Sequence, residues 1–308
     1  MSNKKKFIIT IDNEEDNQWN PLAEETTENA KYLRRFQNLC NKYEYKPVYL
    51  TTYNMAKNAV FEDLAKEALE NNQCEIGMHL HAWSTPPEYN LKSVTNERAY
   101  LIEYPVEVME EKIKIINDVL TSKFGKIVTH RSGRWALNNN YLELLKKYGY
   151  KCDCSVTPGI SWVSNLGATG IGGSDYTREQ NSAYEIINGI LEVPVTIHKL
   201  KYFEKNAIKS VKSIARESSH LIRGKETWLR PSICSLYQMT KLLDYIKMSD
   251  KDYVMFMIHS SELMPGGSPY YKDRESIEEL YIQLESLFEY AHSDYEGITL
   301  SDYIKGKM

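Results

Sequence analysis

The sequence has few cysteines, and their spacing does not suit a disulfide framework or a zinc knuckle. The five are Cys40, Cys74, Cys152, Cys154 and Cys234. An odd, scattered set does not pair up. Cys152 and Cys154 are separated by one residue, whereas a zinc knuckle needs two-residue gaps and a second pair. We therefore expect five reduced thiols, as is typical of a cytoplasmic protein.

Long apolar runs and an excess of one charge are also lacking. The first apolar run, Phe7 to Ile11, meets Asp12 and is too short for a signal peptide. No stretch reaches the ~20 apolar residues of a membrane span. The net charge of −4 argues against nucleic acid as a partner. These absences predict a cytoplasmic protein with no integral membrane segment and no nucleic-acid partner.

The sequence does contain a regular alternation of short apolar runs and helical patterns. Strands are predicted at 7–11, 46–50, 75–81, 127–130, 150–155, 191–197 and 252–258. Helices are predicted at 24–43, 56–72, 106–124, 139–148 and 277–291. This alternation implies an α/β fold with a parallel sheet, and 308 residues suit one closed (β/α) barrel. We expect one domain over 1–308, with an elaborated loop region at about 158–235.

Polar residues follow five of the predicted strands at the point where each strand ends. The segments are Asp12-Asn13-Glu14-Glu15, His79-Leu80-His81, His130-Arg131, Asp153-Cys154-Ser155 and His259-Ser260-Ser261-Glu262. Parallel barrels carry their chemistry at the carboxyl ends of their strands. The five segments are therefore expected to converge on one pocket.

The spacing within two of these segments suits a metal ion. Residues two apart on a strand point the same way, so His79 would lie beside His81 and Asp12 beside Glu14. Two imidazoles with one or two carboxylates suit zinc or a similar divalent ion. Each pair alone has an ordinary alternative, because an acidic pair can cap a helix and His259 can be a structural histidine. The two pairs together favour a metal site.

The ordered set of segments resembles the polysaccharide deacetylase family (carbohydrate esterase family 4). The matching segments are Thr10-Ile11-Asp12, Glu75–Trp83 (EIGMHLHAW), His130–Trp135 (HRSGRW), Asp153–Pro158 (DCSVTP) and His259–Leu263 (HSSEL). They stand in the family's order over most of the chain. The resemblance implies a distorted (β/α) barrel, usually of seven strands, a divalent metal, and removal of acetyl groups from N-acetylated sugars.

Two positions depart from the family's pattern. The family's first motif usually has adjacent aspartates, but here the second position is Asn13, and Glu14 is the nearest carboxylate. Its second motif usually has histidines four residues apart, but Trp83 stands four after His79, so His81 must serve instead. Such changes suit a divergent branch that acts in surface-polysaccharide (O-antigen or capsule) biosynthesis.

The resemblance and the spacing together assign roles at the expected site. Glu14, His79 and His81 would hold the metal, expected to be Zn²⁺, which polarises the amide carbonyl and a bound water. Asp12 would act as general base, and His259 would protonate the departing amine. The roles of Asp12 and Glu14 could be reversed.

Further residues are expected to support these groups. Arg131 would orient Asp12, and Asp153 or Glu262 would tune His259. Arg131 and Asp153 also suit a purely structural ion pair. The expected substrate contacts are Trp83, Arg134, Trp135 and Glu262.

Two other functions fit the same sequence. A hydrolase of small or cyclic amides could use the same scaffold with altered metal motifs. A catalytically inactive carbohydrate-binding protein is favoured by Asn13 and Trp83, which replace residues of the family's motifs.

A basic segment follows a glycine-rich stretch that contains Gly167, Gly170, Gly172 and Gly173. Nine basic residues lie between His198 and Arg230, against three acids: Lys199, Lys201, Lys205, Lys209, Lys212, Arg216, Arg223, Lys225 and Arg230. One interpretation is a solvated helical face. The other is that the segment borders the active site and binds the phosphate of a nucleotide- or lipid-diphosphate-linked N-acetyl sugar.

Overall fold

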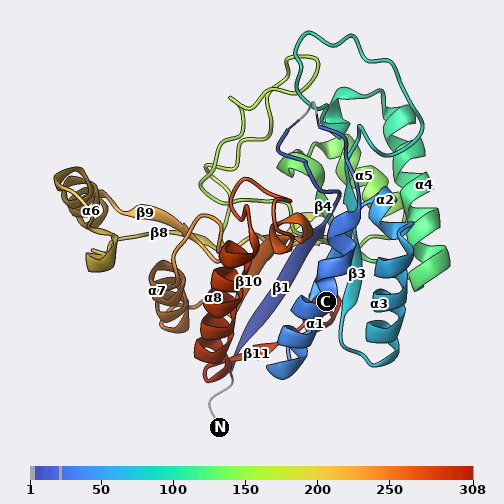
Figure 1. The fold of residues 1–308 in the computed structure, drawn as a ribbon. Helices are drawn as coiled ribbons and strands as arrows, with labels where there is room; N and C mark the ends of the chain where they lie inside the picture. The colour runs from blue at the N-terminus through green and yellow to red at the C-terminus, as the bar shows by residue number, and fades with distance from the viewer. Residues whose placement is uncertain (1–3, 21–22, 308) are drawn as a thin grey trace.

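The computed structural model describes residues 4–20 and 23–307, apart from the side chain of Asn206. Its main element is a curved sheet surrounded by helices (Figure 1). The strands of this sheet are β1 (Lys5–Asn13), β2 (Val48–Thr51), β3 (Glu75–Leu80), β4 (Thr129–Ser132), β5 (Cys152–Asp153), β6 (Tyr184–Ile187), β7 (Ile190–Glu192), β10 (Tyr253–His259) and β11 (Tyr295–Gly297).

Seven strands of the sheet pair in parallel, in the order β10-β1-β2-β3-β4-β5-β7. Strand β6 adds an antiparallel edge to β7, and β11 pairs with β1. Between β7 and β10, Thr196 and Leu229 each accept a hydrogen bond from a backbone N–H of β10, at 2.8 and 3.1 Å. The prediction of a distorted seven-stranded (β/α) barrel is therefore confirmed.

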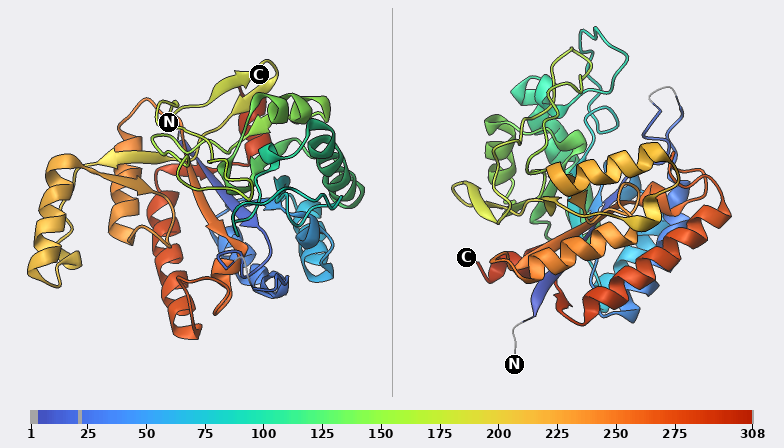
Figure 2. Two further views of the ribbon diagram at one scale, coloured as in Figure 1. Left: turned by 90° about the horizontal axis from the view of Figure 1, so that it is seen from above. Right: turned by 90° about the vertical axis from the view of Figure 1, so that its left-hand side faces the viewer.

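The helices lie mainly around the outer face of this sheet (Figure 1 and Figure 2). They are α1 (Leu33–Lys42), α2 (Tyr53–Ala56), α3 (Ala59–Glu70), α4 (Val106–Phe124), α5 (Asn139–Lys147), α6 (Val211–Arg223), α7 (Leu236–Lys247), α8 (Arg274–His292) and α9 (Leu300–Lys305). No helix in the described ranges has the length and apolar character needed to cross a membrane.

Two predicted elements have different bounds in the structure. The helix predicted at 56–72 is α3 (Ala59–Glu70), which begins after Asn58, because the Asn58 side chain caps it by accepting the N–H of Phe61 at 3.1 Å. The strand predicted at 191–197 becomes β7 and β8 (Ile197–Leu200), with Pro194 between them. Proline has no N–H to give to a strand ladder, which explains the break.

The core lies between the sheet and its covering helices. Strands β1 and β10 are almost fully buried, and they lie side by side over seven residue pairs, from Lys6 with Tyr253 to Asp12 with His259. At the lower end of β1, Phe7 stacks on Tyr45 with ring centroids 4.9 Å apart. This packing holds β1 rigidly, and its carboxyl end carries the polar residues of the candidate site.

Candidate metal centre and active site

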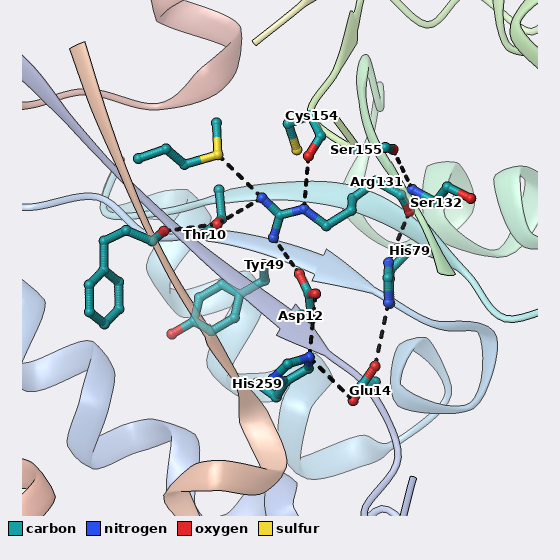
Figure 3. Close-up of polar contacts among 12 residues, drawn as sticks. Thr10, Asp12, Glu14, Tyr49, His79, Arg131, Ser132, Cys154, Ser155 and His259 are labelled. Atoms are coloured by element: carbon teal, nitrogen blue, oxygen red, sulfur yellow. Dashed lines mark hydrogen bonds and ion pairs between the residues drawn. The ribbon is translucent and has the colours of Figure 1, made fainter. Parts of the chain in front are cut away.

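The carboxyl ends of β1, β3, β4 and β10 bring the predicted polar residues together (Figure 3). The strand register places Asp12 beside His259 and His79 beside Arg131. The last long strand of the sheet therefore lies next to the first, as barrel closure predicts. Glu14, just beyond the end of β1, reaches across toward the residues of β3.

Three buried ligand atoms form a compact triangle. Glu14 Oε2 lies 3.4 Å from His79 Nε2 and 3.1 Å from His81 Nε2, and the two Nε2 atoms are 3.0 Å apart. Within the described ranges, this is the one cluster of three or more histidine, cysteine, aspartate or glutamate side chains that could hold a metal ion. A tetrahedral ion with bonds of about 2.0–2.1 Å separates its ligands by about 3.3 Å. The spacing of the triangle therefore fits a divalent metal.

The hydrogen bond of His79 prepares it as a ligand. Its Nδ1 lies 2.9 Å from the carbonyl oxygen of Arg131, and since a carbonyl can only accept, Nδ1 carries the proton. The lone pair of Nε2 then points toward Glu14 and His81. Metal-binding histidines usually have their second nitrogen tied in this way.

Asn13 and Trp83, the two residues that depart from the family's motifs, differ in their position relative to the triangle. The ring of Trp83 stacks on His81 with centroids 4.3 Å apart, and its Nε1–H donates to Glu25 Oε1 at 2.8 Å. On the other edge, His81 Nδ1 lies 3.8 Å from Glu15 Oε2. Asn13 points away from the triangle and donates to Thr51 Oγ1 at 3.3 Å. Glu14, and not Asn13, is therefore the carboxylate that faces the histidines.

Glycine at position 133 allows β4 to approach this cluster. A Cβ atom at Gly133 would lie 2.5 Å from the carbonyl oxygen of Leu80 and 2.7 Å from His81 Cδ2. The next two residues, Arg134 and Trp135, have φ values of 54° and 64°. This left-handed backbone is costly for residues with a Cβ and is often found at functional sites. Both side chains line the pocket described below.

Asp12 is held by a buried arginine. Arg131 Nη1 donates to Asp12 Oδ1 at 2.5 Å, while Nη2 donates to Thr10 Oγ1 at 3.0 Å. Burial alone would raise the pKa of Asp12, but the charge of Arg131, with those of His79 and His259, lowers it below the usual value. Asp12 is thus ionised, and its second oxygen, Oδ2, faces His259 Nε2 at 3.7 Å.

His259 presents its Nε2 atom to the acidic residues and its Nδ1 atom to a second ion pair. Arg230 Nη2 lies 3.1 Å from Nδ1, and Glu262 Oε2 lies 3.4 Å from it. The same Glu262 accepts the backbone N–H of His259 at 2.9 Å and pairs with Arg230 at 3.1 Å. Glu262, buried behind the histidine, therefore fixes the orientation of the ring.

The electrostatics of Glu262 lead to a test of stability. Burial would raise its pKa, but the charges of Arg230 and His259 and the hydrogen bonds from His259 lower it to about 2, from 4.5. A carboxyl whose pKa is lowered on folding adds stability above its unfolded pKa and loses it as the pH falls toward the folded value. In metal-stripped protein, Glu262→Gln should cost about 3 kcal/mol at pH 7 and about 1 kcal/mol at pH 3.

Urea unfolding of both proteins at several pH values measures this difference. Glu289→Gln, at an exposed glutamate of α8, is the control and should show no pH-dependent difference. If Glu262→Gln lowers the free energy of unfolding by the same amount at pH 7 and pH 3, the lowered pKa of Glu262 is contradicted.

Asp153 lies outside this site, and both hypotheses for it are wrong. His130 and Arg131 are neighbours on β4 and point to opposite sides, and Asp153 pairs in register with His130. Asp153 Oδ1 lies 2.5 Å from His130 Nδ1 and accepts from Ser155 Oγ at 2.9 Å. The fully buried carboxyl therefore neither forms an ion pair with Arg131 nor contacts His259.

A cavity of about 470 Å³ opens over the triangle and His259. Trp83, Arg134 and Trp135 line it, as expected for substrate contacts, whereas Glu262 is not among its lining residues. Eight further lining residues were not predicted from the sequence: Gln18, Trp19, Glu97, Arg98, Ser132, Trp162, Asn165 and Tyr270. Trp162 lies just before the glycine-rich stretch, and that stretch could have indicated a loop near the pocket. Trp19 and Tyr270 come from loops after β1 and β10, and only the fold brings them together.

Most of the basic segment does not lie at the active site, where the substrate-binding hypothesis placed it. Of its nine basic residues, only Arg230 lines the pocket. Lys212 and Arg216 lie on α6, which is carried away from the barrel on the β8–β9 pair, and Lys209 lies just before that helix (Figure 1). The segment as a whole therefore does not border the active site.

Comparisons with known proteins identify the fold. No protein-family model and no curated protein sequence matches this chain. A putative polysaccharide deacetylase from Mycobacterium smegmatis is similar in structure, with a TM-score of 0.55, 12% identity, and coverage of 99% of this chain and 91% of its own. A 4-alpha-glucanotransferase from Thermococcus litoralis also has a TM-score of 0.55, with 13% identity and coverage of 98% of this chain. This chain spans only 38% of the glucanotransferase. The molecule thus has the fold found in a polysaccharide deacetylase.

Proposed function

We propose that this protein is a metal-dependent hydrolase that removes the acetyl group from an N-acetylated amino sugar. The observation that carries the proposal is the triangle of Glu14, His79 and His81, set beside the Asp12–Arg131 pair and His259. The fold, which is that of a polysaccharide deacetylase, supports the same reaction class. A ligand set of two histidines and one glutamate is typical of catalytic zinc.

The residues of the site have complementary roles in this reaction. A bound ion would polarise the acetamide carbonyl and lower the pKa of a water molecule. Asp12, ionised and held by Arg131, would accept a proton from the attacking water through Oδ2, the oxygen that Arg131 leaves free. His259 would give the proton on Nε2 to the departing amine, and Glu262 would stabilise the charged ring.

The pocket supports a sugar as the substrate. Trp19, Trp83, Trp135 and Trp162 line it, and flat aromatic faces pack well on the apolar faces of sugar rings. Arg98, Arg134 and Arg230 line the same pocket. Arg98 pairs with Glu25 and Arg230 with Glu262, whereas the hydrogen bonds described for Arg134 go to backbone carbonyl oxygens. The guanidinium of Arg134 would suit a negatively charged substrate, such as a sugar joined to a nucleotide or lipid diphosphate. A cytoplasmic step of surface-polysaccharide synthesis would supply such a substrate. The five cysteines are free and buried, which is compatible with that location.

Metal content tests the proposal directly. Protein purified without chelator should contain about one divalent metal per chain, because the triangle supplies three ligands. His79→Ala and His81→Ala should each abolish the stoichiometric metal in elemental analysis, and the release of acetate from N-acetylglucosamine oligomers should fall with it.

His292→Ala is the control, because this histidine is exposed at the end of α8 beside Lys4, just before the start of β1, whereas the triangle lies at the other end of that strand. Full metal content in both triangle variants would disprove the metal site. Ring opening of a cyclic ureide without acetate release would assign the protein to small cyclic amides instead. Oligosaccharide binding by a metal-free, inactive protein would identify a carbohydrate-binding protein.

A further inference from the structure

An arm projects from the barrel on the side opposite α4. It consists of the antiparallel strands β8 and β9 (Lys225–Trp228), with α6 at its outer end (Figure 1 and Figure 2). Ile197 pairs with Trp228 near the barrel, and Leu200 pairs with Lys225 near the helix. The helix is thus held away from the core that buries the other long helices.

The face of α6 that is buried against the arm is polar. Its buried residues are Ser213 and Glu217. Glu217 Oε2 accepts the backbone N–H of Glu204 at 3.3 Å and lies 3.4 Å from His220 Nδ1. A helix of a globular protein normally turns its apolar face inward. In α6, polar groups occupy that position.

The apolar residues of α6 face solvent instead. Val211 and Ile222 are 83% and 71% exposed, and Ile214 and Leu221 are exposed as well. At 100° per residue, these four side chains lie within an arc of about 100°. Four large aliphatic side chains on one projecting helix form an unpartnered apolar stripe. Such a stripe is costly to expose to water unless something covers it.

The surroundings of this stripe are strongly basic. Seven basic residues of the arm are exposed: Lys199, Lys201, Lys205, Lys209, Lys212, Arg216 and Arg223. Two of the segment's three acids, Glu204 and Glu217, are buried, and only Glu226 is exposed. Within the described ranges, Arg216 is the one exposed base of the seven that forms an ion pair, with Glu217. The arm therefore presents unneutralised positive charge beside an apolar stripe.

We infer that α6 docks on the surface of an anionic lipid bilayer. A short basic helix with a strong apolar face lies in the membrane interface, with aliphatic side chains between the headgroups and lysines at the phosphates. The charge argues against a second copy of the same face, because two such arms would repel each other. The inference does not depend on the proposed reaction. Strand β9 leads from α6 to Arg230 in the pocket, so docking would hold the pocket near the bilayer.

Vesicle flotation with the full chain tests this inference. The protein should float with phosphatidylcholine vesicles that contain about 30% phosphatidylglycerol, and it should not float with phosphatidylcholine alone. Raising the salt from about 0.05 M to about 0.5 M should weaken the binding, because screening shortens the reach of the lysine charges. Absence of binding to the anionic vesicles at low salt would overturn the inference.

Two sets of variants separate the apolar and the charged contributions. Val211→Ser with Ile222→Ser should weaken partitioning about tenfold or more. Lys205→Glu, Lys209→Glu and Lys212→Glu together should weaken it by at least about fivefold per lysine. The inference fails if either set binds as tightly as the wild type.

Matched substitutions elsewhere serve as controls. Val60→Ser with Ile282→Ser changes the same residue types at positions that are 46% and 67% exposed on α3 and α8. Lys126→Glu, Lys146→Glu and Lys151→Glu reverse three exposed lysines outside the arm. Both control sets should bind vesicles nearly as the wild type does. A dimer that Val211→Ser with Ile222→Ser dissociates, in a protein that ignores vesicles, would instead identify a second copy as the partner.

Discussion

Asp12→Asn should lower kcat for acetate release about a thousandfold and leave the metal content unchanged. Asparagine can still accept the hydrogen bond from Arg131, so the local packing should persist. It cannot accept a proton from water, and loss of a positioned general base typically costs about 10²–10⁴-fold. Asp12 is also not one of the three residues of the triangle. Steady-state kinetics and elemental analysis on the same preparation measure both effects.

Glu14→Gln is the matched control for Asp12→Asn. Both variants replace a buried carboxylate of the same strand end by its amide, but Glu14 belongs to the triangle. Glu14→Gln should therefore lose metal and activity together. If Asp12→Asn loses the metal and Glu14→Gln keeps it, the two carboxylates have the reverse roles. Full activity in Asp12→Asn would exclude Asp12 as the base.

The strand ends were predictable from the sequence because strand geometry is local. An apolar run followed by a polar residue marks the rim of a parallel barrel, and the two-residue period placed His79 and His81 on one side. The neighbouring position of Asp12 and His259 followed from closure of the barrel, and the register confirms it. The same logic predicted the fold class.

Strand ends in the sequence do not predict residues that loops bring to the site. They also do not tell which face of the sheet a strand-end side chain lies on. Arg230 lies at the end of the arm, and no periodicity in the sequence connects it with His259. Asp153 was misassigned because its strand end looks like the others, although its side chain pairs with His130 on the far side of β4. The basic segment is evident from the sequence, but its position on an arm away from the pocket depends on tertiary structure.

The buried pair of Asp12 and Arg131 connects the function of the site to its stability. Arg131 is fully buried, and it also donates to the carbonyl oxygen of Cys154 at 3.1 Å. Removing one partner of a buried ion pair leaves the other charge without compensation, which typically costs about 3–5 kcal/mol. In metal-stripped protein, Arg131→Met should therefore lower the free energy of unfolding by about this amount, measured by urea denaturation.

The double variant tests the cause of that loss. If the cost comes from the stranded charge of Asp12, adding Asp12→Asn to Arg131→Met should restore at least about 2 kcal/mol, because asparagine carries no charge. Arg34→Met breaks another arginine–carboxylate pair, that of Arg34 with Glu67, but both partners are exposed, so stability should hardly change. A double variant no more stable than Arg131→Met would place the loss in packing and in the bonds to Thr10 and Cys154. Recovery in the double variant would show that Asp12 can stay ionised at this site because Arg131 compensates its buried charge.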